Sequence, residues 1–298
     1  MVSKHDDDRD RALAILTRER DELRFRLSLL DSLPLMQGRP RLDVPQEMLR
    51  GYLLLESDER FFTSVALERH ERFVRVWYTY LNMLREGILA IGNTLDVPDG
   101  SIRTQLALRF IAASGGTVKL ILDASLAGYY TQAYGLVRHL FETWLRLEYI
   151  RLRPDEARKW FIHDDGSDPR PPNEATIHGY VEKHSTGNLK TAVTMVKKKI
   201  SDLNAMAHPS PNTLQQTQGS FENQLQVGAN YDPELSFSVL HEGASGLRFI
   251  LTALNDVVPQ PQDWNDRLQC TIDLHGEVLQ WEKERLKAEG RARVDPSN

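Results

Sequence analysis

The chain has 298 residues, of which 41% are hydrophobic and 27% charged, with a formal net charge of −5 at pH 7 and a pI near 6.0. This balance is typical of a globular protein with a sizeable core, and its acidity argues against wholesale wrapping of nucleic acid while leaving room for a local basic patch. One cysteine, Cys270, excludes an intramolecular disulfide and a zinc site built from several cysteines.

The usage of cysteine fits a reducing cytoplasm. The opening residues MVSKHDDDRD are too polar for a secretory signal, and no run approaches the roughly 18 uninterrupted apolar residues of a membrane span. We therefore expect a cytoplasmic protein that does not associate with a membrane.

Residues 9–32 have the pattern of a charged helix in which Leu16, Leu23 and Leu30 recur every seven residues. This short heptad seam suits packing on the body or on a second subunit. We expect an appended helix within residues 1–32 and, because prolines and a glycine follow, a linker at 33–46.

Helical periodicity then fills residues 47–290, and a polar tail, expected to be disordered, ends the chain at 291–298. No alternating strand pattern appears, so the predicted fold class is all-α, a multi-helix bundle. The expected helices are at least one long helix in 46–93, one from 101 or 104 to about 127, one over 130–153, one starting at Pro154, and then 177–182, 188–206, 233–254 and 264–288.

Two glycine pairs lie inside these helical patterns. Gly115-Gly116 costs helix stability, about 1 kcal/mol per glycine relative to alanine, and we expect it to let a neighbouring helix approach closely. The stretch Gly243-Ala-Ser-Gly246 likewise predicts close packing.

The helix over Tyr130–Arg153 organises the rest. Its apolar positions cover well over half of its circumference, which predicts a nearly enclosed central helix. A narrow polar stripe remains, in which Arg138, Glu142 and Arg146 follow one another at i, i+4.

This stripe has two interpretations. Glu142 precedes Arg146 by four residues, the better orientation for a helical ion pair, which contributes about 0.2–0.5 kcal/mol and needs no function. Alternatively, Arg138 and Glu142 are only partly solvated, and partly buried charges need partners and are candidates for a functional site.

Several familiar sites are absent, among them a phosphate loop, HExxH, a GxSxG elbow and a dinucleotide fingerprint. The loop at 163–173 carries His163, Asp164, Asp165 and Asp168 but lacks the spacing of a calcium loop, which favours a solvated acidic loop over a cation site. We expect no metal and no cofactor.

Lys197, Lys198 and Lys199 form a basic run on a helix, either a solvated face or a contact for phosphates. Nearby, His208 stands where a helix ends before Pro209. A histidine there is either a cap for the last carbonyls or, because the helix dipole stabilises its protonated form, a general acid or phosphate contact.

Tyr134–Leu145, with its Arg138-His-Leu-Phe-Glu142 core, and Met206-Ala-His208-Pro-Ser210 some sixty residues later resemble a group of bacterial helical proteins similar to the HEPN superfamily. The resemblance covers about residues 100–255. It implies a metal-independent ribonuclease or RNA-binding protein of a defence, abortive-infection or toxin-type system, whose site is usually doubled across a dimer.

In that family an arginine precedes the histidine by four to six residues. His208 matches the histidine, but Asp202, Leu203 and Asn204 fill the window. Asn204 and Arg138 are the candidates to replace the missing arginine.

Two hypotheses follow. The first is a HEPN-like effector acting on RNA, in which His208 handles protons and Arg138 neutralises phosphate. The second is a non-catalytic interaction module. In both we expect a homo-oligomer, and in the first we expect Arg138, Glu142 and His208 to converge on one cleft with residues 210–232 at its mouth.

Overall fold

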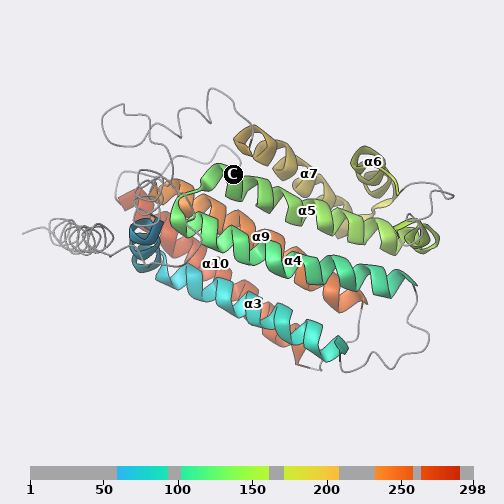
Figure 1. Ribbon diagram of the computed structural model, residues 1–298, viewed down its shortest axis with the longest axis horizontal. Helices are drawn as coiled ribbons and strands as arrows, with labels where there is room; N and C mark the ends of the chain where they lie inside the picture. The colour runs from blue at the N-terminus through green and yellow to red at the C-terminus, as the bar shows by residue number, and fades with distance from the viewer. Residues whose placement is uncertain (1–58, 93–101, 161–170, 208–231, 258–262, 289–298) are drawn as a thin grey trace, which may run out of the picture.

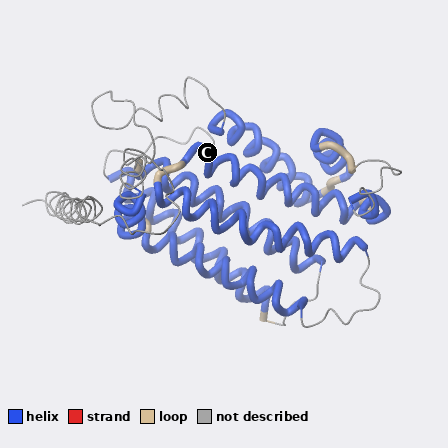
Figure 2. Tube along the Cα trace, in the orientation of Figure 1, coloured by secondary structure: helices blue, strands red, loops and turns tan. Residues whose placement is uncertain are grey.

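The computed structural model of the chain describes residues 59–92, 102–160, 171–207, 232–257 and 263–288 (Figure 1). These residues are 94% helical and contain no strand, which confirms the predicted all-α multi-helix fold (Figure 2). The expected N-terminal helix, linker and C-terminal tail lie outside them. The helices are α3 (Glu71–Gly92), α4 (Ile102–Ala127), α5 (Tyr130–Leu152), the 3₁₀ helix η1 (Pro154–Trp160), α6 (Glu174–His184), α7 (Gly187–Ala207), α9 (Pro233–Val257) and α10 (Trp264–Ala288).

The centre of the bundle is α5, as predicted. It packs against α4, α9, α7, α6 and η1, and most of its residues are buried, including Leu140, Phe141 and Trp144. Helix α9 is the second central element, since it contacts α3, α4, α5 and α10. In Figure 1, α7 and α6 cover one side of α5, while α3 and α10 lie on the opposite side of the bundle.

The helix ends follow local chemistry. Gly128 has a φ of 86°, a conformation that suits glycine, and it separates α4 from α5. Asn173 caps α6 by accepting a hydrogen bond from the backbone N–H of Thr176 at 2.9 Å. Pro154 begins a new element, as predicted, but that element is a single 3₁₀ helix rather than an α-helix.

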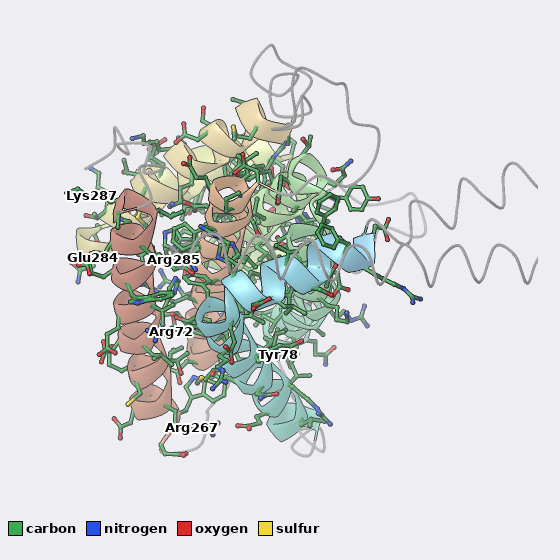
Figure 3. All side chains as sticks on the ribbon, turned by 90° about the vertical axis from the view of Figure 1, so that its left-hand side faces the viewer. Arg72, Tyr78, Arg267, Glu284, Arg285 and Lys287 are labelled. Carbon is green, nitrogen blue, oxygen red and sulfur yellow. The ribbon has the colours of Figure 1, made fainter. Side chains whose placement is uncertain are left out.

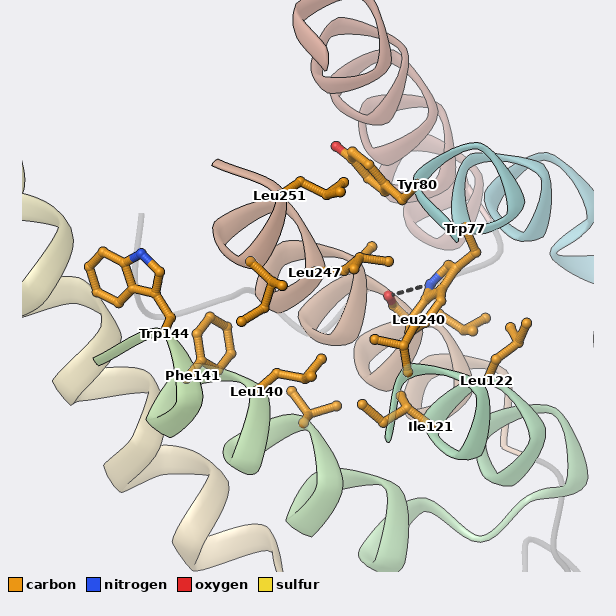
Figure 4. Close-up of a cluster of buried hydrophobic side chains, with 14 of the residues drawn as sticks. Trp77, Tyr80, Ile121, Leu122, Leu140, Phe141, Trp144, Leu240, Leu247 and Leu251 are labelled. Atoms are coloured by element: carbon orange, nitrogen blue, oxygen red, sulfur yellow. Dashed lines mark hydrogen bonds between the residues drawn. The ribbon is translucent and has the colours of Figure 1, made fainter. Parts of the chain in front are cut away.

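Gly243 and Gly246 of α9 confirm the close packing expected of their stretch, since they lie against Trp77 and Leu140, two of the side chains labelled in Figure 4. A Cβ placed on Gly243 would lie 2.6 Å from the Trp77 ring of α3, and one on Gly246 would lie 3.1 Å from Leu140 of α5. The Trp77 indole N–H donates a 2.8 Å hydrogen bond to the Leu240 carbonyl. Helix α9 therefore packs closely on α3 at Gly243 and on α5 at Gly246, because neither glycine carries a side chain.

The other glycine pair behaves differently from its prediction. A Cβ on Gly115 would meet only Leu84, at 3.9 Å, and one on Gly116 would meet nothing within 4 Å. None of the described helices approaches closely there, because Gly116 is on the exposed face of α4. Among the described helices, α4 alone is long and apolar enough to cross a membrane by length and composition, and 39% of its most apolar window is buried.

The start of α9 is fastened to the start of α5. The backbone N–H of Asp232 donates to the Tyr130 hydroxyl at 2.9 Å. The Asp232 carboxylate in turn accepts from the N–H groups of Glu234 and Leu235, which caps α9.

Candidate functional site

Arg138 and Glu142 form an ion pair along α5. The Arg138 Nε donates to Glu142 Oε1 at 2.7 Å, and the two side chains are 33% and 9% exposed. This confirms the interpretation in which both charges are only partly solvated. Because little water surrounds the Glu142 carboxylate, solvent screens this ion pair less than it screens an ordinary surface pair.

Arg146 does not take Glu142 as its partner, which differs from the first interpretation. Its Nε donates to Glu174 Oε1 of α6 at 2.8 Å, and a second guanidinium nitrogen contacts the same oxygen. Because α6 packs on α5, it brings a carboxylate to Arg146 that the sequence pattern of α5 alone does not reveal. Glu142 is then left to pair with Arg138.

Glu174 joins Arg146 to His178, whose Nε2 lies 3.5 Å from its other oxygen. Burial alone would raise the pKa of Glu174, but the nearby His178 and the hydrogen bonds from Arg146 outweigh it and lower that pKa. The polar stripe of α5 thus faces a carboxylate held ionised on the neighbouring helix.

The end of α7 reaches the same side of α5. A Cβ on Gly135 would lie 4.0 Å from the Cβ of Ala207, the last described residue of α7. Gly135 is three residues before Arg138, so Ala207 meets α5 within one turn of the Arg138–Glu142 pair. His208 itself, residues 163–170 of the acidic loop and residues 208–231 lie outside the described residues.

Asn204 is one turn before Ala207 on α7. The two helices run in opposite directions (Figure 1), so a step back from Ala207 along α7 corresponds to a step forward from Gly135, toward Arg138. The Asn204 Oδ1 atom is buried and has no hydrogen-bond partner among the described residues. A buried unpaired amide oxygen is costly, and it marks a place where a donor from elsewhere would be stabilised.

The lysines of the 197–199 run on α7 do not converge on one site. Lys197 pairs with Glu182 of α6 at 2.5 Å, and Lys199 pairs with Glu242 of α9 at 2.5 Å. Lys198 is exposed. Lys197 and Lys199, for which the sequence left open a solvated face or a phosphate contact, therefore form ion pairs between helices.

Sequence reasoning missed a second polar cluster, between α3, α9 and α10. The Tyr80 hydroxyl shares a 3.3 Å hydrogen bond with Nδ1 of His275, whose Nε2 lies 3.2 Å from Nδ1 of His241. Phe73 packs edge-on to both imidazoles. Since a neutral imidazole carries one N–H, His275 donates to one neighbour and accepts from the other.

Further along the same interface, His70 and Glu282 are both fully buried, 3.3 Å apart. Arg285 lies 2.6 Å from the second Glu282 oxygen and donates to the Arg69 carbonyl at 2.8 Å. His70 itself is the turn between the helical residues 59–69 and α3. The end of α10 is thereby joined to that turn.

Figure 3 views this side of the molecule and labels Arg285 on α10 and Arg72 on α3. The two guanidinium groups lie 5.1 and 4.3 Å from the centre of the Trp281 ring. These cation–π contacts cover the interface from the outside.

The two buried histidines have lowered pKa values. Burial lowers the pKa of His275 to about 3, helped by His241 and by Arg248. Burial also lowers the pKa of His70, against the opposing effect of Glu282. Both imidazoles are therefore neutral near pH 7.

The sequence did contain a signal for this cluster. Thr271, His275, Val278, Glu282 and Leu286 are spaced by three or four residues, and all five are buried. Polar residues at core-facing positions of a helix indicate an internal polar contact.

Among the described residues, no group of three or more histidine, cysteine, aspartate or glutamate side chains is arranged to hold a metal ion. In comparisons with known proteins, the chain matches no family model, no curated protein and no solved structure.

Proposed function

We propose that the chain is a HEPN-like helical effector of a bacterial defence or toxin-type system that cleaves RNA without a metal ion, in the cytoplasm, at the junction of α7 and α5. The observation that carries this proposal is the contact of Ala207 with Gly135. The residue before His208 meets α5 within one turn of the Arg138–Glu142 pair, as a shared site requires.

Each group has a role in the proposed chemistry. His208 takes the proton of a ribose 2′-hydroxyl as that oxygen attacks the adjacent phosphorus, and the bond from phosphorus to the 5′-oxygen breaks. A proton returned by the imidazolium completes the 5′-hydroxyl product, and the other product is a 2′,3′-cyclic phosphate. Arg138 stabilises the charge on the phosphate oxygens, and Glu142 holds Arg138 in place.

Asn204 supplies the remaining contact. Its buried, unpaired Oδ1 accepts a hydrogen bond from a hydroxyl or amino group of the substrate. Asn204, which lies four residues before His208 where the family has its arginine, thus positions the substrate. The positive charge is supplied by Arg138 of α5 instead.

A second candidate, a non-catalytic interaction module, is favoured by the ion pairs already present. Arg138, Lys197 and Lys199 each have a carboxylate partner. In this alternative the charges hold α5, α6, α7 and α9 together, and the chain binds a partner without cleaving it.

The test is cleavage of a labelled single-stranded RNA in the presence of EDTA. We expect the wild-type chain to produce 2′,3′-cyclic phosphate ends, and His208→Ala to lower the rate by about 100-fold or more, the usual contribution of a general acid or base. Arg138→Ala should lower it as well.

His184→Ala is the control for His208→Ala. His184 is exposed on α6, where its imidazole bonds to the Tyr180 carbonyl of the same helix. Cleavage at the wild-type rate in both histidine variants would point to a contaminating nuclease. No cleavage of any RNA by the wild-type chain favours the interaction module, and a large drop in the melting temperature of His208→Ala identifies His208 as a structural cap.

A further inference from the structure

The face of α10 that packs on the bundle is unusually polar. Seven residues of α10 are buried, and three of them, Thr271, His275 and Glu282, are polar. Thr271 contacts the Met83 sulfur of α3, and His275 bonds to Tyr80 of the same helix. Because polar groups gain far less than apolar groups from leaving water, this face holds α10 less firmly than seven apolar side chains would.

Helices α3 and α9 pack on each other without help from α10. The Trp77 indole of α3 donates to the Leu240 carbonyl of α9 and lies against Gly243. Phe73 of α3 packs edge-on to Phe237 of α9, with 5.4 Å between the ring centres. The contacts of α10 with the described helices are mainly those with α3 and α9. Helix α10 can therefore open as a separate unit while the rest of the bundle stays packed.

His275 is at the centre of the α10 interface and uses both ring nitrogens. Nδ1 lies 3.3 Å from the Tyr80 hydroxyl of α3, and Nε2 lies 3.2 Å from Nδ1 of His241 on α9. One of these bonds needs a nitrogen of His275 as its acceptor, and an imidazolium, with two N–H groups, has none. Arg248 of α9 adds a nearby positive charge. A proton on His275 therefore weakens the attachment of α10.

His70 makes the interface sensitive to protons at a second point. Its Nδ1 contacts Glu282 of α10, and its fully buried Nε2 has no hydrogen-bond partner among the described residues. An added proton on Nε2 would thus be buried without an acceptor. Glu282 favours a charged His70, but burial opposes it, as do the guanidinium groups of Arg285 and Arg69. On the α9 side, only the Phe237 ring stacks on this imidazole.

We propose that α10 separates from α3 and α9 in mildly acidic solution while the helices around α5 stay folded. In the separated form, His275 and His70 reach water and bind protons that the closed form excludes, so a fall in pH shifts the population toward it. Separation uncovers the side chains of Phe73, Tyr80 and Met83 on α3, which α10 contacts in the closed form.

Hydrogen exchange of the full chain, read by mass spectrometry on peptides from α10 and α5, tests the separation. Protection is taken relative to the intrinsic exchange rate at each pH. We expect α10 to be less protected than α5 at pH 7.5. Between pH 6.5 and 5.5, His275 alone should lower the protection of α10 by up to about tenfold, while α5 keeps the greater protection. Equal protection of both helices at every pH would mean that α10 opens only when the whole chain unfolds, which overturns the proposal.

Substitution of the histidines tests the cause. His275→Gln keeps a side chain that donates and accepts but binds no proton, so we expect a shallower loss of α10 protection with falling pH. His70→Gln should also make this loss shallower, and it provides the test if His275→Gln opens α10 at every pH. His184→Gln, on the exposed side of α6, is the matched control and should keep the wild-type pH dependence.

Two results of these substitutions contradict the proposal. One is a loss of α10 protection that stays as steep as in the wild-type chain in both His275→Gln and His70→Gln. The other is α10 protection that does not change with pH in the wild-type chain. RNA cleavage enters neither measurement, so this inference stands or fails independently of the proposed activity.

Discussion

At Gly243, α9 comes so close to the Trp77 ring of α3 that no side chain fits between them. We expect Gly243→Ala to destabilise the protein, since forcing a methyl group into a packed core costs about 1–3 kcal/mol. The higher helix propensity of alanine offsets about 1 kcal/mol of this. Urea denaturation should show a net loss in the free energy of unfolding.

Gly276→Ala provides the comparison. The same substitution at this exposed helical position adds no contact, so we expect it to raise the free energy of unfolding by up to about 1 kcal/mol. If both variants changed stability in the same direction, close packing at Gly243 would not be the cause.

Glu282 is a second single residue on which the stability of the fold depends strongly. Its fully buried carboxylate contacts both His70 and Arg285. We expect Glu282→Ala to lower the free energy of unfolding by about 3 kcal/mol, because removing one member of a buried pair leaves its partners uncompensated. Equilibrium denaturation measures this.

Glu284→Ala is the neighbouring control, an exposed carboxylate that accepts a hydrogen bond from Gln280. Its effect should stay within about 0.5 kcal/mol. A Glu282 variant as stable as the Glu284 variant would mean that His70 and Arg285 lose nothing with the carboxylate.

Single residues differed in how well the sequence revealed them. Gly243 and Gly246 were predicted as packing positions because glycine inside a helical pattern has few other uses. His70, His275 and Glu282 were missed because such residues are usually on the surface. For His275 and Glu282, only their spacing with buried apolar residues on α10 indicated otherwise.

At the scale of elements, α10 is held to α3, and to the turn at His70 just before it, by a row of polar contacts. Arg267 pairs with Glu86, Thr271 contacts the Met83 sulfur, His275 bonds to Tyr80, and Glu282 contacts His70. The α3 partners come earlier in the chain as the α10 residues come later, so the two helices are antiparallel. Two of the four contacts rely on a neutral, buried histidine.

This interface makes stability depend on pH. The pKa of His275 is lowered to about 3 and that of His70 is also lowered, so below the ordinary value of 6.5 the unfolded chain binds protons that the folded chain does not. The stabilisation is fully present above pH 6.5. As pH falls from 6.5 toward 5, we expect His275 to remove up to about 1.4 kcal/mol of stability per pH unit, and His70 to add to this loss in the same direction.

Denaturation at pH 7.5, 6.5 and 5.5 measures this slope. His275→Gln should reduce it, because one of the histidines with a lowered pKa, which are His70, His139 and His275, is gone, while His184→Gln on the exposed side of α6 should leave it unchanged. An unaltered slope in His275→Gln would refute the role of His275. Carboxylates with lowered pKa values, such as Glu174, act at lower pH and do not obscure this window.

Helix boundaries followed the sequence where proline, glycine or a cap marks them. The last helix was predicted at 264–288, and α10 spans Trp264–Ala288. Helix α6 begins at Glu174 rather than 177, because its first turn is mostly exposed and carries no apolar period. Its start is set by the Asn173 cap instead.

For the whole molecule, the enclosed α5 was predictable because apolar residues cover most of its circumference. The partners of its polar stripe were not, since they depend on where α6 and α7 pack. Glu174 reaches Arg146 from α6, and Ala207 reaches Gly135 from α7. The candidate site was therefore predictable on α5 but not in its neighbours.

Two contacts on α5 determine where α7 ends and where α9 begins. Helix α7 ends against Gly135, and α9 begins at Asp232, which is bonded to Tyr130. These two points on α5 are five residues apart, about 7.5 Å along its axis. The end of α7 and the start of α9 thus lie close together on α5, and a connection much shorter than residues 208–231 would join them. The bundle therefore does not require the length of this connection, and because the entropic cost of closing a loop grows only slowly with its length, the additional residues beyond that minimum cost the fold little.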